Sequence, residues 1–347
     1  MSDTQWYLVT GHGYQVGLLA DRAVADAIAE RGRPWIRVAP ADGPPGSDAP
    51  RVLTGPLDGP HAGWERFSEQ ETNGQLRELL ADRATRSVWV PAQHSQPWYA
   101  LQVLRTIRNL LRWQALAAGC PCLHAGLIEI DGVGILVAGH KRAGKTSTVL
   151  AALSVLHCGF VSNDDATLRE GDDSAEHPTR WTGLGWPRSV NIRPDTLSVL
   201  AEIAPAIGQL REISTHPRMD YSKADAASFT VYPDDICELL DVQRRPLAPV
   251  AAIVLPRFAD TSEPVLTRLA TDTATEMISQ NIDRRATDHD GYLREWFGEL
   301  DETRARGHAA RLAKDLECYE LTQSLAAAAV SAELLADLAR AARRELV

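Results

Sequence analysis

The sequence has few cysteines and no long hydrophobic run, and each shortage excludes a class of protein. Its 347 residues include five cysteines, an odd number, which excludes a disulfide-stapled scaffold. The Cys120-Pro121-Cys122 pair has no second pair to complete a zinc site. We expect reduced, mostly buried thiols and therefore a cytoplasmic protein. No stretch of 18 apolar residues is present and Met1 to Tyr7 shows no signal peptide, so we expect no membrane partner.

Positive charge is also in short supply. Lysine and arginine together number 36 against 46 aspartates and glutamates, which gives a net charge of -10. A protein that binds nucleic acid usually carries a basic surplus because it must neutralise phosphates. We therefore expect no nucleic-acid partner. The 44% of hydrophobic and 24% of charged residues are ordinary for a globular protein, and the length suggests two or three structural units.

The first part of the chain, residues 1–98, is expected to form a small accessory domain to which the sequence assigns no chemistry. Asp21 to Glu30 predicts a short helix that ends at Gly32. Residues 40–62 are rich in proline, glycine and aspartate, which favours a long loop or hinge. Ser87 to Val90 predicts a strand.

The remainder, residues 99–347, shows the mixed periodicity of an α/β domain. Apolar residues recur at helical spacing from Tyr99 to Ala118, and we expect the arginines of the opposite face to meet solvent. Two apolar segments joined by Asp131-Gly132 predict a tight hairpin, so the strand that leads into residue 139 should be its second arm. The hairpin arms are Leu127–Ile130 and Ile135–Ala138, and the arginines are Arg105, Arg108 and Arg112. The sequence also predicts helices over Lys145–Leu156, Thr273–Ile282 and Ala326–Glu345, and strands over Phe160–Ser162 and Ala251–Leu255. A capping box of Thr273 and Glu276 is expected to open the second of these helices.

A glycine-rich segment joins the hairpin to the next helix. Residues 139–146 read Gly-His-Lys-Arg-Ala-Gly-Lys-Thr and match the phosphate-loop pattern G-x-x-x-x-G-K-[ST] between a predicted strand and a predicted helix. Backbone N–H groups of such a loop and the positive end of the helix surround phosphate oxygens. Lys145 supplies charge for the β- and γ-phosphates, and the Thr146 hydroxyl can reach magnesium. We expect a magnesium–nucleoside triphosphate to bind here through Gly139, His140, Lys141, Arg142, Ala143, Gly144, Lys145, Thr146 and Ser147, although Lys141 and Arg142 would equally suit a surface that meets solvent.

Three carboxylate- and imidazole-bearing positions accompany the loop. Asp164 and Asp165 follow a predicted strand about twenty residues on, and two such carboxylates can divide the roles of metal ligand and general base. Strand alternation would point them in different directions. His124 lies just before the hairpin, and its pKa suits proton handling. Its spacing does not place it near the phosphates.

Basic residues further along the chain are weaker candidates. The segment from Gly183 to Arg193 suggests a shaped loop in which Arg188 and Arg193 either hold phosphate oxygens or lie at the surface. Lys223 lies in a polar stretch, residues 220–228, that would suit a mobile loop.

Taken together, Leu123-His124-Ala125-Gly126, the hairpin, the phosphate loop and Asn163-Asp164-Asp165 resemble the HPr kinase/phosphorylase family, and especially the smaller HPr-kinase-like proteins of bacterial biosynthetic gene clusters. The resemblance covers roughly residues 120–347. It implies an α/β fold with a P-loop core of the HPr kinase and phosphoenolpyruvate carboxykinase type, with a mixed sheet.

The resemblance also implies residue roles. Lys145 would be the phosphate lysine, Thr146 a magnesium ligand, Asp164 the general base and Asp165 a metal ligand, with the two aspartates open to exchange. His124 would tune or relay the proton of that base, and Arg193 would position phosphate. The loop residues His140 to Ala143 differ from the smaller, less charged ones of the bifunctional members, which favours a peptide or natural-product hydroxyl as acceptor over protein HPr.

The sequence therefore predicts an ATP- and Mg²⁺-dependent kinase that transfers the γ-phosphate to a hydroxyl of a peptide or small molecule. Three alternatives stay open: a nucleotide-binding regulator without phosphoryl transfer, an HPr-type protein serine kinase, and a carboxykinase-like enzyme. A homo-oligomer is also open, and residue types do not identify the acceptor.

Overall fold

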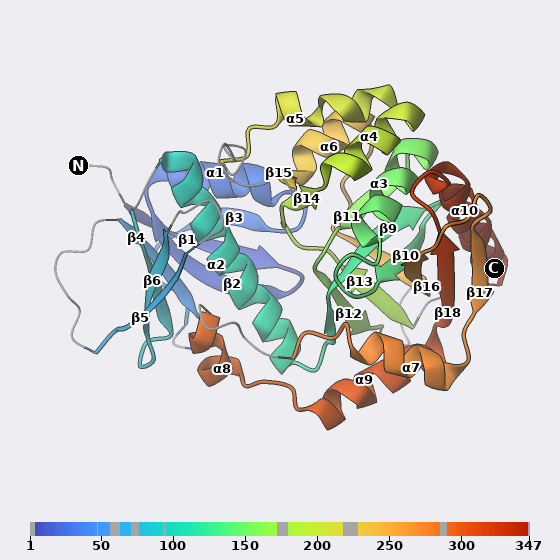
Figure 1. Cartoon of the computed structure of the whole chain (residues 1–347). Helices are drawn as coiled ribbons and strands as arrows, with labels where there is room; N and C mark the ends of the chain where they lie inside the picture. Colours follow the sequence, from blue (N-terminus) through green and yellow to red (C-terminus); the bar gives the residue numbers. More distant parts are fainter. Residues whose placement is uncertain are drawn as a thin grey trace. The chain divides into compact units, whose positions relative to one another are not determined.

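Two compact units make up the computed structural model, and both combine helices with mixed sheets (Figure 1). The described residues are 4–46, 48–55, 63–70, 76–92, 95–171, 180–217, 228–284 and 290–345. The first unit contains the described chain up to Gly119 together with residues 290–299, and the second unit contains the rest. The α/β class expected from the sequence is therefore confirmed.

The first unit is built on a seven-stranded sheet with the order β3-β1-β2-β4-β7-β6-β5. Its strands are β1 (Gln5–Gly11), β2 (Tyr14–Ala20), β3 (Arg37–Ala41), β4 (Arg51–Gly55), β5 (Glu65–Gln70), β6 (Leu76–Asp82) and β7 (Ser87–Pro91). β4 lies at the centre and pairs in parallel with β2 and β7, whereas the other pairings are antiparallel. The prediction of a long loop over residues 40–62 is therefore wrong for residues 51–55, which form β4. Residues 56–62 lie outside the described chain.

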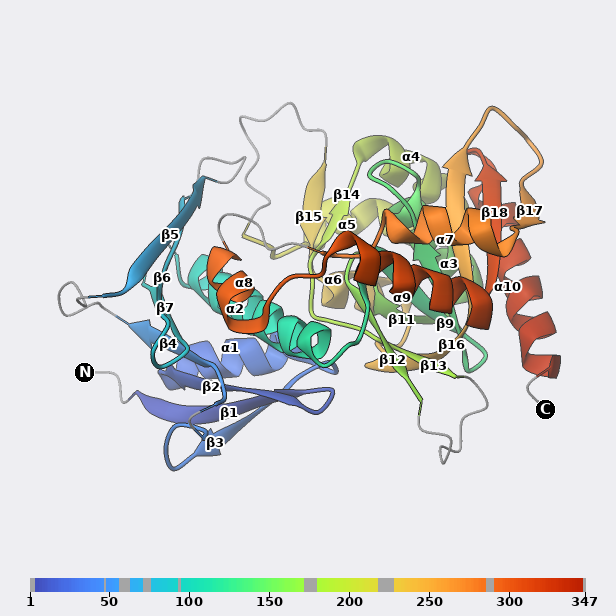
Figure 2. The ribbon, with the colours of Figure 1, turned by 90° about the horizontal axis from the view of Figure 1, so that it is seen from below.

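Helices α1 (Arg22–Gly32) and α2 (Gln96–Ala117) pack on this sheet (Figure 2). The predicted first helix is confirmed, and the Asp21 carboxylate caps it by accepting from the Val24 N–H at 2.8 Å. α2 packs on α1, β2 and β4, and its Ile107 and Leu111 are fully buried. The expected domain boundary between residues 98 and 99 falls inside α2, because the apolar face of this helix forms part of the core of the first unit.

Two of the α2 arginines differ from the expectation of a solvent-facing surface. Arg108 and Arg112 are each only 8% exposed. Helical spacing places them opposite the first apolar stripe, but α2 is covered on more than one face. A charged residue within a long apolar helix does not by itself indicate that this face of the helix is exposed to solvent.

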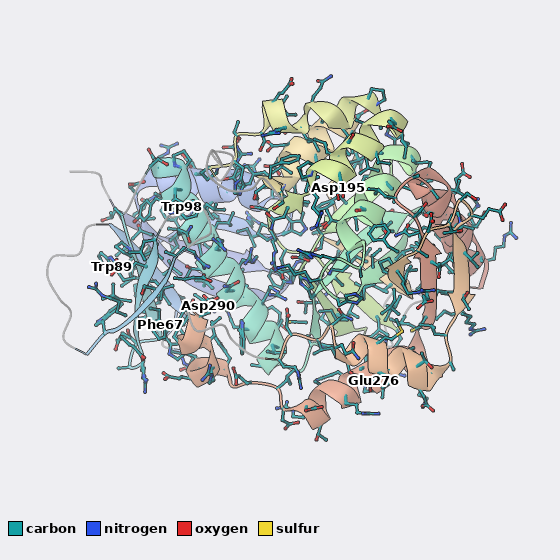
Figure 3. All side chains as sticks on the ribbon, viewed as in Figure 1. Phe67, Trp89, Trp98, Asp195, Glu276 and Asp290 are labelled. Carbon is teal, nitrogen blue, oxygen red and sulfur yellow. The ribbon has the colours of Figure 1, made fainter. Side chains whose placement is uncertain are left out.

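α8 (Gly291–Phe297) belongs to the first unit although it lies far along the sequence. The Tyr292 ring packs edge-on against Phe67 of β5, with ring centroids 5.6 Å apart, and against Trp296. The Asn109 amide of α2 donates to the carboxylate of Asp290, the residue before α8, at 3.3 Å; Figure 3 labels Asp290 and Phe67. These contacts fix α8 to the sheet and to α2.

A nine-stranded mixed sheet forms the centre of the second unit. Its main path is β11-β9-β10-β16-β13-β12-β8, and β18 pairs with both β16 and β17. On one edge, the long strand β16 pairs in parallel with β10. On its other edge, β16 pairs antiparallel with β13 along its first residues and in parallel with β18 along its last ones. The strands are β8 (Cys122–Leu123), β9 (Ala125–Ile130), β10 (Val133–Ala138), β11 (Gly159–Ser162), β12 (Ala166–Glu170), β13 (Trp181–Leu184), β16 (Leu247–Phe258), β17 (Val265–Arg268) and β18 (Glu317–Gln323), with β14 (Val190–Ile192) and β15 (Phe229–Val231) forming a separate pair.

The predicted hairpin is confirmed: β9 and β10 pair antiparallel from Ile130 and Val133 to Ala125 and Ala138. The strands predicted before the Asp-Asp pair and at Ala251–Leu255 are confirmed as β11 and part of β16. Residues 183–193 are more regular than expected, because β13 ends and β14 lies within them. Lys223 lies outside the described residues.

Helices surround this sheet. They are α3 (Lys145–Leu156), α4 (Pro194–Ile203), α5 (Leu210–Ile213), α6 (Pro233–Leu240), α7 (Thr271–Ser279), α9 (Glu302–Asp315) and α10 (Ala328–Glu345), with a 3₁₀ turn over Pro205–Gln209. The expected capping box at Thr273 is wrong: α7 begins two residues earlier and Ala270 is its N-cap, because Thr273 already lies within the first turn. None of the helices in the described ranges has the length and apolar character of a bilayer-crossing segment.

Candidate functional site

The hairpin delivers the glycine-rich segment to the start of α3. β10 ends at Ala138, residues 139–144 form the loop, and α3 begins at Lys145. Gly144 is the N-cap of α3 and has a φ of 107°, a left-handed conformation that glycine adopts without steric cost. The first N–H groups of α3 therefore face the loop without intrahelical acceptors, an arrangement that suits an anion.

A second glycine lets the acidic turn approach the loop. A Cβ atom at Gly126 of β9 would lie 2.6 Å from the Val149 side chain of α3 and 3.0 Å from the Asn163 carbonyl oxygen. Glycine is therefore needed at this position for β9, α3 and the turn before Asp164 to pack together. This contact connects the His-Ala-Gly segment to the two carboxylates.

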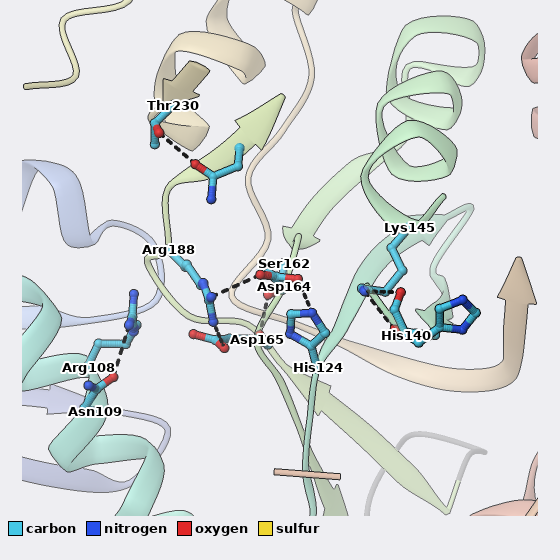
Figure 4. Close-up of polar contacts among 12 residues, drawn as sticks. Arg108, Asn109, His124, His140, Lys145, Ser162, Asp164, Asp165, Arg188 and Thr230 are labelled. Atoms are coloured by element: carbon cyan, nitrogen blue, oxygen red, sulfur yellow. Dashed lines mark hydrogen bonds and ion pairs between the residues drawn. The ribbon is translucent and has the colours of Figure 1, made fainter. Parts of the chain in front are cut away.

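Lys145 folds back over the loop. Its ammonium donates to the Gly139 carbonyl at 2.8 Å and to the His140 carbonyl at 3.2 Å, and the residue is only 6% exposed (Figure 4). Burial lowers the Lys145 pKa, while the negative charge of Asp164 acts in the opposite direction. The charge of the carboxylate thus influences the ammonium, although the two form no ion pair among those that the described residues show. A carboxylate that acts on the phosphate lysine is compatible with a phosphoryl-transfer site.

Asp164 and Asp165 lie in the turn between β11 and β12, and both meet the same guanidinium. Arg188 Nη2 lies 3.1 Å from Asp164 Oδ2, and Arg188 Nη1 pairs with Asp165 Oδ1. The expectation that strand alternation separates the two carboxylates is wrong, because β11 ends at Ser162 and the pair follows in the turn. The Ser162 hydroxyl donates to the Asp165 carbonyl oxygen and closes this turn (Figure 4).

His124 lies against the first of these carboxylates. Its Nε2 is 3.2 Å from Asp164 Oδ1, and its backbone N–H donates to the Asn281 carbonyl at 2.8 Å. Burial lowers the His124 pKa, against the raising effect of Asp164, and the charges of Lys145 and Arg188 lower it further. The neutral imidazole is therefore favoured, and a neutral imidazole beside a carboxylate can accept or relay a proton.

Tertiary contacts hold Arg188 at the acidic pair. The Trp186 indole N–H donates to the Thr167 hydroxyl of β12 at 2.9 Å, and the Ser189 hydroxyl hydrogen-bonds to His216 at 2.8 Å. Arg193, by contrast, pairs with the exposed Asp195 on the first turn of α4. Of the two arginines that the sequence offered on equal terms, only Arg188 has ion pairs to Asp164 and Asp165 among those that the described residues show.

The other predicted loop residues divide into exposed and buried groups. His140, Lys141 and Arg142 are exposed and Ala143 is buried. Thr146 is partly exposed at the first turn of α3. The Ser147 hydroxyl lies 3.2 Å from that of Thr196 on α4. The loop thus presents a basic outer edge and a polar inner turn.

Two further residues border the loop that sequence reasoning did not identify. A Cβ atom at Gly144 would lie 3.0 Å from the Phe258 ring and 3.4 Å from Gln323 Nε2. Both residues end strands, Phe258 in β16 and Gln323 in β18. The sequence offered no motif to find them, because pairing of the parallel strands brings them to α3.

The donor set fits a hard divalent cation. Mg²⁺ is usually held by one or two carboxylates together with substrate phosphates; Asp164 and Asp165 are carboxylates, and Thr146 adds a hydroxyl oxygen. The Asn163 Oδ1 is buried and has no hydrogen-bond partner among the described residues. Within the same part of the chain, no group of three or more His, Cys, Asp and Glu side chains is placed to hold a metal.

Comparisons with known proteins add little to this geometry. The scan against protein-family models found no match, and the search of curated proteins found none either. Among solved structures, the chain is similar to the Hpr(Ser) kinase/phosphatase from Coxiella burnetii at 12% identity and a TM-score of 0.28, over 65% of this chain and 97% of that one. A likeness this distant carries no argument about the reaction of this chain.

Proposed function

We propose that the second unit is an ATP-dependent kinase that transfers the γ-phosphate to a hydroxyl of a peptide or small-molecule acceptor. The observation that supports this most is the position of Asp164, whose carboxylate lies 3.2 Å from His124 and whose charge acts on the loop lysine, Lys145. A phosphate loop alone would support nucleotide binding. A carboxylate whose charge reaches the phosphate lysine supports transfer, because the attacking hydroxyl must lose a proton.

Each residue has a task in this proposal. The α3 N-terminus and Lys145 bind the phosphates and hold charge on the transferring group. Asp164 accepts the proton of the acceptor hydroxyl as that oxygen attacks the γ-phosphorus and the bond to the β-phosphate oxygen breaks. His124 holds the carboxylate in place and takes part in moving the proton. Thr146 and Asp165 would hold magnesium, which supplies charge neutralisation at the phosphate oxygens.

The test separates binding from transfer. We expect Asp164→Asn to lower turnover by about 10²- to 10⁴-fold, the usual contribution of a general base, with ATP affinity changed only a few-fold. Lys145→Ala should weaken ATP binding itself, because it removes a charge from the phosphate site. Binding is followed with a fluorescent ATP analogue, and transfer with γ-labelled ATP and a library of serine- and threonine-containing peptides.

A matched control is Asp272→Asn, which removes one exposed carboxylate from α7 in the same unit. It should leave binding and transfer unchanged. Undiminished turnover in Asp164→Asn would remove that residue from the mechanism. Wild-type protein that binds ATP but labels no acceptor would favour the nucleotide-binding regulator instead.

A further inference from the structure

Arg188 occupies both carboxylates of the candidate site at once. One guanidinium nitrogen lies 3.1 Å from Asp164 and another pairs with Asp165 (Figure 4). The fork geometry of a guanidinium matches two carboxylates better than a lysine ammonium does. The arginine therefore binds the same oxygens that the proposed function assigns to a base and a metal ligand.

The burial of Asp165 makes this contact energetically important. Its side chain is only 1% exposed, whereas those of Asp164 and Arg188 are 20% and 32% exposed. A buried carboxylate needs a compensating charge, and loss of its partner is strongly destabilising. Arg188 provides that charge at Asp165.

We propose that Arg188 and a divalent cation are alternative partners of the Asp164–Asp165 pair, so that the arginine holds the carboxylates together until metal–nucleotide displaces it toward the phosphates. This inference rests on the proposed function, and it makes Arg188 a positioning residue of the kinase site. Both partners are cations that bind carboxylate oxygens, so binding of one weakens binding of the other. Once displaced, a guanidinium is well suited to phosphate oxygens, which it binds with two parallel hydrogen bonds.

The sign of the expected effect is unusual. If Arg188 only supported the metal site, its substitution would weaken metal binding. Here, removing the arginine removes a competitor, so Arg188→Met should bind divalent cations more tightly than the wild type. The same variant should turn over more slowly, because the carboxylates and the phosphates both lose a positioning contact.

The experiment needs no nucleotide and no acceptor. Mn²⁺ binding to wild type, Arg188→Met and Arg188→Lys is titrated by electron paramagnetic resonance, and melting of each is followed with and without 10 mM Mg²⁺. We expect about tenfold tighter Mn²⁺ binding in Arg188→Met. We also expect a melting temperature roughly 6–20 °C lower without metal, a loss that Mg²⁺ restores by about half or more.

A matched control is available in the same unit. Arg244 pairs with Asp234, a carboxylate that is 8% exposed, and Arg244→Met removes a charged partner from a single buried carboxylate. It should lower the melting temperature in a similar way, but Mg²⁺ should not restore it. The comparison separates the replacement of a guanidinium by a metal at a carboxylate pair from general stabilisation by salt.

The outcomes are distinct. Equal Mn²⁺ affinity in wild type and both Arg188 variants would overturn the inference. So would equal rescue of the Arg244 variant by Mg²⁺. Arg188→Lys retains one charge but loses the fork geometry of the guanidinium. If Arg188→Met does not fold, Arg188→Lys should still bind Mn²⁺ more tightly than the wild type. Weaker binding by that variant would overturn the proposal. Because no phosphoryl transfer is measured, a failure of the kinase proposal would leave this result readable on its own.

Discussion

The residue at the start of α3 shows how one backbone conformation shapes the candidate site. Gly144 has a φ of 107°, and the Phe258 ring lies 3.0 Å from the place where a Cβ would be. We expect Gly144→Ala to destabilise the second unit by about 1–3 kcal/mol, from left-handed strain together with the ring contact. Nucleotide affinity should fall at least about tenfold, because the first N–H groups of α3 must shift.

Gly132, in the hairpin turn, provides the control for that prediction. Its φ is 85°, and nothing lies within 4 Å of a Cβ built there. Gly132→Ala should therefore cost the strain but leave nucleotide affinity unchanged. Urea unfolding and a titration with the fluorescent ATP analogue measure both quantities. Equal affinities for Gly144→Ala and wild type would show that the N-terminus of α3 does not contact the nucleotide.

At the scale of elements, one hydrogen bond ties the last strand of the sheet to the loop helix. Gln323 Nε2 of β18 donates to Thr148 Oγ1 of α3 at 2.7 Å, and both residues are 2% exposed. Thr148→Val should destabilise by about 1–3 kcal/mol, because it leaves a buried amide donor without its acceptor. The double variant Thr148→Val/Gln323→Met should be less destabilised than the sum of the two single variants. Chemical denaturation of the four proteins gives the coupling energy, and additive effects would contradict a direct contact of this strength.

Elements that form from local contacts were predictable from the sequence. The hairpin depends on the Asp131-Gly132 turn, and α3 has the same bounds as the predicted helix, because turn chemistry and apolar patterning act over a few residues. β4 was missed because its parallel pairing with β2 and β7 is non-local and its flanks are rich in proline and glycine. Parallel pairing leaves no signature at the turn.

In the candidate site, too, the residues that local motifs identify were predicted, and those that non-local contacts position were not. The loop lysine and the acidic pair were predicted from motifs and the role of the histidine from the family resemblance, whereas the choice of Arg188 over Arg193 at the carboxylates was not predicted. Both arginines lie in one short segment. Which of them meets Asp164 depends on the anchoring of Trp186 to Thr167 and of Ser189 to His216, which are contacts between residues distant in sequence.

For the whole molecule, the distribution of cysteines offers a probe that reports on one unit alone. The sequence has no cysteine before Cys120, so all five thiols belong to the second unit; none forms a disulfide, and all are buried. Burial raises the pKa of Cys158, Cys237 and Cys318 to about 12 each. Thiolates, not thiols, react with disulfide reagents, so native protein at pH 8 should label far more slowly than unfolded protein.

The same shifts predict how alkali acts on the second unit. The folded pKa of these thiols lies above the unfolded value of 9.0, so their contribution to stability is complete below pH 9 and is lost as the pH rises toward 12. Labelling with a chromogenic disulfide across a urea gradient should reach five thiols per chain as the second unit unfolds. The urea concentration at the midpoint of that labelling should decrease as the pH is raised from 9 to 11. Rapid reaction of several thiols in native protein at pH 8 would contradict the burial that sets this dependence, since a thiol held in an apolar core must first be exposed before it can ionise and attack.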